Sequence, residues 1–442
     1  MDERLSPSLL EKVSYLGVLL KSFPQGEVAA EKLLEFVLGS KRIERVTERI
    51  GWERVAAREA EVAAYQQVTL AEKTAEPTAD TRRKSAAVMT DGGRHQRVEP
   101  NEDSQSHWYE YKAGICLSLE SDASDTDPCP DVPEFLFNQE HVATLTREIG
   151  QKAADVPEAA AASVLEESAG VSLSAATDSP GLEALLTSAA QTATQTVPSA
   201  TARSRGLPLS PDVRSRDVVA TLENSREFGR MLVARAWFLG LFFAVRKAFV
   251  ADGQNWNWSL FEQHFKPFGF VPILDLIHAV TYVYAAATAG RPLSEAWPIY
   301  RRWITWVWGG EVSRVIAELA ARQWELGRPT ESDGDTSPRR IVSDALTYLQ
   351  NQQSRMNYPE YRRLGLPLTS SHMESTIKEL NQRVKGSEKF WSQDGGEAVL
   401  QLKADTLCDS HPLSDFWTNR QQTRTGFHAN VHQPSNAQIQ AA

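Results

Sequence analysis

Apolar residues recur every three or four positions through residues 6–70, as in LLEKVSYLGVLL and VAAEKLLEFVLG. This period is typical of amphipathic helices, and the intervening KSFPQGE predicts a break between two of them. SKRIERVTERIGW follows with more basic residues, and Ser40 is a candidate N-cap. Short helices ending in a basic third helix are typical of a helix-turn-helix, although generic helical packing explains the same pattern.

The period then changes to that of strands. KSAAVMTDGGRHQRVE is an apolar run, and WYEYKAGICLSLE alternates, which together predict two successive antiparallel strands. Further along, DVVATLENSREFGRMLVARAWFLGLFFAVRKAFVADG predicts an amphipathic helix, a turn and a buried strand that ends at Asp252. A helix over NWSLFEQHF and a strand over GFVPILDLIH follow. Ten of the twelve Trp lie from Trp237 onward, so we expect the main core in this half.

Two regions interrupt this pattern. Residues 138–227 contain no Phe, Trp or Tyr and include a long Ala/Ser/Thr-rich stretch, which cannot bury much apolar surface and predicts a disordered insertion. The aromatic stretch SEAWPIYRRWITWVWGGEVSRVIAELAARQWELG predicts a helical insertion. We divide the chain into a helical, helix-turn-helix-like DNA-binding region (1–75), a first core segment (76–149), the disordered insertion (150–214), a second core segment (215–285), the helical insertion (286–350), C-terminal helices (351–420) and a frayed tail (421–442).

Charge and composition restrict the function classes only weakly. The net charge of −10 comes from one segment, because residues 120–200 hold 14 acidic and two basic residues and the remainder is close to neutral. The acidity therefore does not exclude DNA as a partner. Three cysteines without a CxxC pair argue against a disulfide framework and a Cys-based zinc site. The apolar runs are too short or too charged to span a bilayer, and no signal-peptide core follows Met1, so we expect an intracellular protein without membrane contact.

Three acids stand where a metal-dependent phosphoryl-transfer site would need them. Asp91 ends an apolar run in VMTDGG, Asp252 ends one in FVADG, and Glu374 opens a helix in SSHMES. Clustered carboxylates are ligands for Mg²⁺, and two such ions can activate a nucleophile and stabilise the leaving oxygen of a phosphodiester. Each acid also has a simpler interpretation. Asp-Gly at the first two is typical of a turn, and Ser371 and Glu374 have capping-box spacing.

The helix that carries Glu374 has two stripes. Met373, Ile377, Leu380 and Val384 have the spacing of a buried stripe. Beside it, the acid shares a face with Lys378, Asn381 and Lys385, as expected of a helix laid along a phosphate backbone, although a solvated helix could look the same. Arg383 and Lys389 are further candidate phosphate ligands, and Trp391 is a candidate for stacking on an end base, with core packing as the alternative.

Three blocks of the sequence resemble a known family. They are VMTDGGRHQ with WYEYKAGICLSLES and DPCPDVPE, then KAFVADGQNWNW with HFKPFGFVPILDLIHAVTYVYAAATAGR, and finally YPEYRRLGLPLTSSHMESTIKELNQRVKGSEKFWSQDGGEAVLQLKA. They are similar to the Kra-type bacterial insertion-sequence transposases, which belong to the DDE class near the Mutator-like branch. The similarity runs from about Leu5 to about Trp417, apart from the Ala-rich insertion, and the last block is the most specific.

The resemblance implies an α/β fold with large helical parts. Its core would be a ribonuclease-H-like mixed sheet, interrupted by the disordered and helical insertions and preceded by a small all-helical domain. The first and last catalytic, metal-binding acids match Asp91 and Glu374. The order of the Mutator-like pattern assigns Asp252 as the second acid and Asp275/His278 as an accompanying pair; the swapped assignment, with Asp275 catalytic, stays open, and so does a core-packing role for His278.

The implied activity is that of a metal-dependent DNA transposase, which cleaves transposon ends and joins them to target DNA. The cofactors would be two Mg²⁺ ions, with Mn²⁺ as a substitute, and the partner double-stranded DNA. A homo-oligomer on DNA, in the bacterial cytoplasm at the nucleoid, is the expected state. Two alternatives are a catalytically inactive DNA-binding remnant or repressor of the element, and a helical protein-interaction scaffold in which the acids are coincidental.

Overall fold

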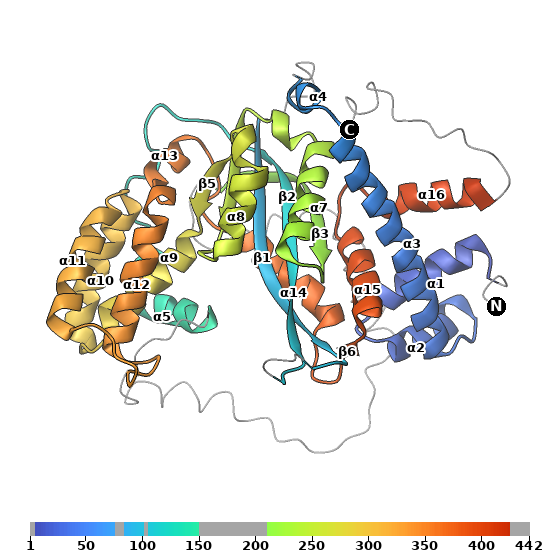
Figure 1. The fold of residues 1–442 in the computed structure, drawn as a ribbon, viewed down its shortest axis with the longest axis horizontal. Helices are drawn as coiled ribbons and strands as arrows, with labels where there is room; N and C mark the ends of the chain where they lie inside the picture. Colours follow the sequence, from blue (N-terminus) through green and yellow to red (C-terminus); the bar gives the residue numbers. More distant parts are fainter. Residues whose placement is uncertain (1–4, 76–83, 101–104, 150–209, 425–442) are drawn as a thin grey trace. The chain divides into compact units, whose positions relative to one another are not determined.

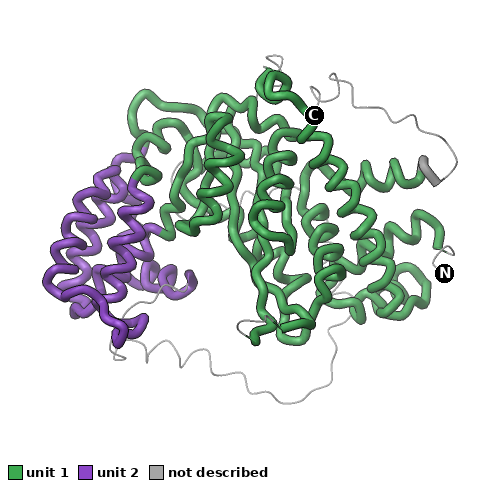
Figure 2. The backbone as a smooth tube through the Cα atoms, in the orientation of Figure 1, with its two compact units in different colours: residues 1–128, 210–278, 354–442 green, residues 129–209, 279–353 purple. Residues whose placement is uncertain are grey.

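The computed structural model describes residues 5–75, 84–100, 105–149 and 210–424. The chain divides into two compact units (Figure 2). Unit 1 comprises Met1–Pro128, Ser210–His278 and Ser354–Ala442, and unit 2 comprises Cys129–Leu209 and Ala279–Gln353. Most of the predicted disordered insertion, and the tail beyond Arg424, lie outside the described residues.

Unit 1 is built on one mixed sheet (Figure 1). Its strands are β1 (Ser85–Arg97), β2 (Trp108–Glu120), β3 (Asp212–Thr221), β4 (Arg246–Ala251), β5 (Val271–Leu274) and β6 (Phe390–Trp391). The order is β3-β2-β1-β4-β5, and β6 pairs with the far end of β1. Strand β2 is antiparallel to β1 and β3, whereas β4 runs parallel to β1 and to β5. The predicted α/β class and the antiparallel first pair are therefore confirmed.

Strand β3 is where the prediction from the sequence is wrong. DVVAT was assigned to the start of a helix, but it forms the end of β3, and the helix α7 (Ser225–Phe238) begins only after Asn224 has capped it. The five residues Asp217–Thr221 are all buried in succession, so they lack the alternation that marks a half-buried strand. The first residues of β3 also lie inside the range assigned to the insertion.

Helices cover both faces of the sheet. On one face, Gly114 of β2 packs against Phe228 and Leu232 of α7, and Thr90 of β1 bonds to α8 (Asn255–His264). On the other face, Tyr111 of β2 bonds to α14 (Ser371–Val384). Because neighbouring residues of a strand point to opposite faces, Asp91, which follows Thr90, belongs to the face covered by α14.

The N-terminal helices belong to the same unit as the sheet. These are α1 (Pro7–Leu19), α2 (Phe23–Leu34), α3 (Ser40–Gln67) and the short α4 (Leu70–Thr74). Helix α3 lies along α15 (Gln393–Asp405) so closely that a Cβ at Gly51 would stand 2.4 Å from the carbonyl oxygen of Ala398. The predicted helices are confirmed, with Gly39 rather than Ser40 as the N-cap of α3. They do not form a separate unit.

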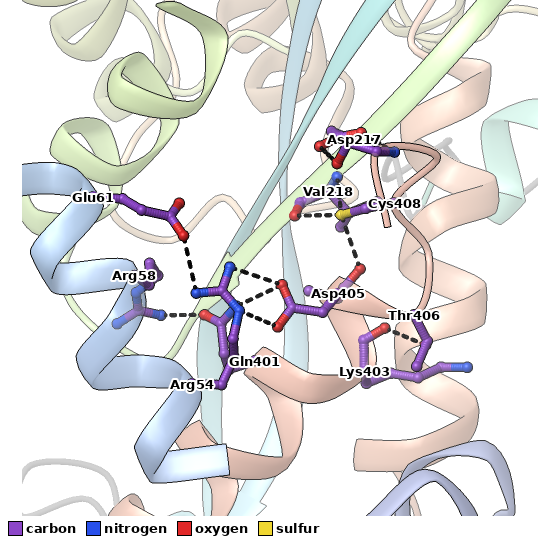
Figure 3. A network of polar contacts seen from close by, with 12 residues as sticks. Arg54, Arg58, Glu61, Asp217, Val218, Gln401, Lys403, Asp405, Thr406 and Cys408 are labelled. Atoms are coloured by element: carbon purple, nitrogen blue, oxygen red, sulfur yellow. Dashed lines mark hydrogen bonds and ion pairs between the residues drawn. The ribbon is translucent and has the colours of Figure 1, made fainter. Parts of the chain in front are cut away.

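Buried ion pairs tie α3 to α15 (Figure 3). Arg54 is 4% exposed, and its Nε lies 2.9 Å from Oδ2 of Asp405. One turn further along α3, Nη1 of Arg58 donates to Glu397 and Gln401. Glu397 also accepts from Thr221 and Leu222 at the end of β3. These two arginines lie beyond the basic stretch SKRIERVTERIGW, in the second half of α3, and they point into the unit.

Unit 2 is helical in its described part. It contains most of α9 (Leu276–Thr288), together with α5 (Gln139–Glu148), α10 (Leu293–Trp308), α11 (Val312–Leu326) and α12 (Pro338–Gln352). The helices predicted for residues 286–350 are present, but the unit that contains them begins earlier, at Ala279, and also includes residues 129–149, which were assigned to the core. Aromatic polar groups account for this, because the Tyr300 hydroxyl donates to the Leu136 carbonyl and the Trp308 indole to the Cys129 carbonyl.

The remaining helices of unit 1 are α13 (Tyr358–Arg363) and α16 (Pro412–Arg424). Helix α16 extends past residue 420, so the first residues of the predicted frayed tail are helical. Across the described residues, no helix combines the length and the apolar character needed to cross a membrane.

Candidate active site

Three aspartates each come directly after a residue in one row of paired residues, which crosses β1, β4 and β5. Thr90 of β1 pairs with Ala251 of β4, and Ala251 pairs with Leu274 of β5. The next residue of each strand is Asp91, Asp252 and Asp275, respectively. Neighbouring strands lie about 4.8 Å apart, and residues in one row point to the same face. The parallel topology therefore places in one row three acids that are up to 184 positions apart in the sequence.

The Asp-Gly-Gly sequence at Asp91 is not a turn. Asp91, Gly92 and Gly93 lie inside the 13-residue strand β1 and pair with Ala113, Lys112 and Tyr111 of β2. A Cβ at Gly93 would stand 2.0 Å from the Tyr111 ring, so this glycine makes room for the ring. The Tyr111 hydroxyl in turn donates to Oδ1 of Asn381, at 2.9 Å, which ties α14 to the sheet beside Asp91.

Asp252 is held by an asparagine that the sequence did not single out. Oδ1 of Asp252 accepts from the Gln254 amide (3.0 Å) and from Nδ2 of Asn257 (2.7 Å). Asn257 is fully buried, and its Oδ1 accepts from the Thr90 hydroxyl at 2.8 Å. Asn257 therefore couples the middle of β1 to the residue that follows β4. Asp252 also takes the turn role considered for it, because its bond to the second following amide is that of an Asx turn. The signal in the sequence that could have identified Asn257 is its place as a polar residue between two Trp residues in DGQNWNW.

Asp275 is fully buried, and both of its oxygens are occupied. Oδ1 accepts from the amides of Ile277 and His278 at the start of α9, and Oδ2 accepts from the amide and hydroxyl of Ser370 before α14. The carboxylate thus anchors two helices to the end of β5. Asp252, whose Oδ2 makes no hydrogen bond with a described residue, is freer to bind an ion, so the geometry favours Asp252 over Asp275 as the second acid.

His278 lies against Asp275, with Nδ1 3.6 Å from Oδ1. Burial lowers the pKa of His278, but the hydrogen bond and the charge of Asp275, and then the charges of Asp252 and Asp91, outweigh it and raise the pKa to about 9. Among these acids the imidazole is therefore a cation at neutral pH. Hydrogen bonding to His278 and Ser370 also keeps the pKa of Asp275 below its ordinary value, although burial acts in the opposite direction.

Glu374 lies in the first turn of α14, but it does not cap the helix. The N-cap is Ser370, and Ser371 is already the first helical residue, so Glu374 is one position beyond that of a capping box. The Ser370 hydroxyl is engaged with Asp275, and no side chain caps α14. The capping-box alternative is therefore wrong. The predicted buried stripe is confirmed at Met373, Leu380 and Val384, with Ile377 half-buried.

The charges of the three predicted acids act on one another. Burial, the charge of Asp252 and, more weakly, the charge of Glu374 raise the pKa of Asp91 to about 7, against the Gly92 amide and His278, which lower it. Like charges shift a pKa in this way only when they lie close together. The structure therefore brings Asp91, Asp252 and Glu374 into one electrostatic neighbourhood.

The donor types suit Mg²⁺, which prefers carboxylate oxygens. The mutual repulsion at Asp91 is also what a cation would relieve. Within the described ranges, however, no group of three His, Cys, Asp or Glu side chains is arranged closely enough to hold a metal ion. The acids therefore fit the ion in their chemistry, but their side chains do not form a preformed cage.

Three of the six predicted DNA ligands are structural residues. Arg383 is 2% exposed, donates to the Gly17 carbonyl and lies over the Phe23 ring. Lys389 donates to the carbonyls of Gln382 and Arg383 at the end of α14, and burial, Arg383 and Lys21 lower its pKa to about 8. Trp391 is buried and donates to the Val384 carbonyl, so its predicted base stacking is wrong and the core-packing alternative is right.

The other three predicted DNA ligands, Lys378, Asn381 and Lys385, differ in exposure and in their bonds. Lys378 and Lys385 are exposed and make no ion pair with a described residue. Asn381, which lies between them on the same face, is half-buried and uses its Oδ1 for Tyr111. A phosphate-binding role therefore stays a prediction for the two lysines.

A buried histidine near the site supports a prediction on pH. His95 is 2% exposed and contacts the rings of Tyr109 and Tyr111, and neither ring nitrogen has a hydrogen-bond partner among the described residues. Burial, together with the charge of Arg97, lowers its pKa from 6.5 to about 4. Below pH 6.5, His95 is therefore protonated in the unfolded chain but stays neutral in the folded chain. The free energy of unfolding falls as the pH falls.

We expect the His95→Phe variant to lose this dependence. When the pH is lowered from 7 to 5, the wild type should lose about 2 kcal/mol of unfolding free energy because of His95. The variant, which lacks the histidine, should not lose this amount. Urea unfolding of both proteins at the two pH values measures the difference. Equal pH slopes in the two proteins would contradict the assignment.

The sequence matches no family model, and no curated protein is significantly similar to it.

Proposed function

We propose that this chain is a metal-dependent DNA transposase of the DDE class, built on a ribonuclease-H-like core. The observation that carries the proposal is the placement of Asp91 and Asp252 directly after paired residues of β1 and β4, with Glu374 on α14, the helix that covers the same face of the sheet as Asp91. Burial and the charges of Asp252 and, more weakly, Glu374 raise the pKa of Asp91. Such perturbed, converging acids are typical of functional sites.

The topology supports the same proposal. The first acid lies on the first strand, the second directly follows the fourth strand, and the third lies on a helix that comes after the helical insertion. This is the order that the resemblance implies. The partner would be double-stranded DNA, bound by a homo-oligomer in the bacterial cytoplasm at the nucleoid.

Asp91, Asp252 and Glu374 would hold two Mg²⁺ ions, which supply activation of the attacking oxygen and stabilisation of the leaving one. The chain's own residues prepare this arrangement. Asn257 fixes Asp252 against β1, the Tyr111–Asn381 bond fixes α14 beside Asp91, and the charge of His278 offsets the acids. Pre-positioning of this kind is what such a reaction needs from the protein.

The first test is Mn²⁺ binding, measured by calorimetry on the wild type and the Glu374→Gln variant. Wild-type binding that weakens about tenfold or more in the variant is expected, because removing one carboxylate takes away both a ligand and a charge. Glu388→Gln is the matched control, since Glu388 is an exposed acid in the loop after α14 and should leave binding unchanged. Equal affinities in wild type and Glu374→Gln would remove Glu374 from the site, and absent binding would remove the metal site.

A further inference from the structure

The end of the β1–β2 hairpin carries two exposed aromatic rings in one row. Gln96 of β1 pairs with Trp108 of β2 on one side and with Phe390 of β6 on the other. Trp108 is 39% exposed and Phe390 46% exposed, whereas the next residue, Trp391, is buried. The sequence had singled out Trp391 for stacking, but alternation along β6 turns Trp391 inward and Phe390 outward.

Basic groups accompany both rings. Nζ of Lys385 lies 5.9 Å from the centre of the Trp108 ring, and the His107 ring meets Phe390 edge-on at 5.3 Å. Lys385 is exposed and makes no ion pair with a described residue. Two exposed acids, Glu99 and Glu388, are near in sequence, so the surface is not uniformly basic. Attraction of a phosphate chain by net charge alone is therefore a poor account of it, whereas aromatic stacking assisted by a cation fits it.

We propose that Trp108 and Phe390 form a stacking platform for unpaired nucleotides of DNA, with Lys385 as a phosphate ligand. The choice of DNA rests on the proposed function. Exposed aromatic side chains beside cations are the elements with which proteins bind single strands, because every base offers a π-face. Two rings on either side of one strand stand roughly 10 Å apart, which suits two bases that are no longer stacked on each other.

The two exposed lysines come from α14 and the residue that ends it. Lys378 is exposed on the helix, and Lys385 is its C-cap residue. The rings lie in the row of Gln96, which points to the opposite face of the sheet from Asp91, so the platform is a site separate from the acids.

The experiment measures the binding of a fluorescently labelled oligo-dT by anisotropy, with EDTA present. We expect Trp108→Ala and Phe390→Ala each to weaken binding about tenfold, and Trp108→Tyr, which keeps a stacking ring, to stay within about threefold of the wild type. Lys385→Ala should lower the salt dependence by about one phosphate contact. Trp324→Ala is the matched control, since Trp324 is 89% exposed on unit 2 and should change nothing.

Several outcomes would overturn the platform. These are wild-type affinity in both alanine variants, no binding of the oligonucleotide by the wild type, or an equal loss for a blunt duplex. Thermal melting checks that the variants are folded, which exposed positions permit. Since EDTA removes the divalent ions, this result is independent of the metal site. Binding that depends on Trp108 in a protein without nicking activity would leave the platform standing and refute the transposase.

Discussion

Asp91→Asn is expected to abolish metal-dependent nicking of DNA while binding is retained. Asp91 shares its neighbourhood with Asp252 and Glu374, and its own carboxylate makes a hydrogen bond only to the amide of Gly92 among the described residues. Asn keeps the shape and that acceptor but removes the charge. Loss of one such group from a preorganised site costs on the order of a thousandfold in rate. A supercoiled plasmid that carries the gene and its flanking sequence, incubated with Mn²⁺, measures the loss, and gel shift measures the binding.

Two further variants separate the candidate second acids. Asp252→Asn should lose nicking with little change in melting temperature, since Asp252 is half-buried and bonded only near the strand end. Asp275→Asn should lower the melting temperature instead, because its fully buried carboxylate accepts from four donors. Nicking by Asp91→Asn at the wild-type rate, or a wild type that never nicks, would refute the proposed activity.

Arg54→Met is expected to destabilise the protein by about 3 kcal/mol, because it leaves Asp405 buried without its cation. Burial already raises the pKa of Asp405 in spite of Arg54, and removal of Arg54 should raise it further. A carboxyl with a raised folded pKa loses stability as the pH rises toward that pKa. The variant should therefore be weaker at pH 8 than at pH 5, as urea unfolding at the two pH values would show.

The double variant Arg54→Met with Asp405→Leu is the informative partner. Replacing both charges by apolar groups should recover most of the loss, since a buried ion pair gains little over apolar packing. Glu262→Gln is the control, because it removes the exposed pair with Lys266 and should cost under about 1 kcal/mol. A single variant as stable as the wild type would show that the pair does not hold α3 to α15.

The sequence predicted the elements better than their partners. Helical spacing placed α14 and its buried stripe, and the antiparallel pair β1–β2 was predicted from its two successive strand-like stretches. The run that ends β3 was missed because consecutive burial removes the period on which prediction depends. The turn at Asp91 was considered only because Asp-Gly-Gly is a local signal, whereas the reason for Gly93 is a ring on another strand.

The site shows the same division. Asp91, Asp252 and Glu374 were predicted from the resemblance, the two aspartates also from their places after apolar runs and Glu374 from its place at the start of a helix, and their catalytic role stays a prediction. Asn257 and Tyr111 were missed because their roles are tertiary: each joins two elements that only the sheet brings together. The errors at Arg383 and Trp391 have one cause, since a basic or aromatic residue suggests a ligand until its buried partner is known. That partner is the Gly17 carbonyl for Arg383 and the Val384 carbonyl for Trp391.

The contact between α3 and α15 has a consequence for the order of events during synthesis on the ribosome. Asp405, the partner of Arg54, is synthesised 351 residues later. Unit 1 therefore cannot complete its core until α15 has left the exit tunnel. The stretch of unit 2 from Ala279 to Gln353 is translated before that point and contains mainly local helix contacts, so it can fold while unit 1 is still open. Until then the nascent chain exposes the apolar surface of α3 that α15 covers in the folded unit.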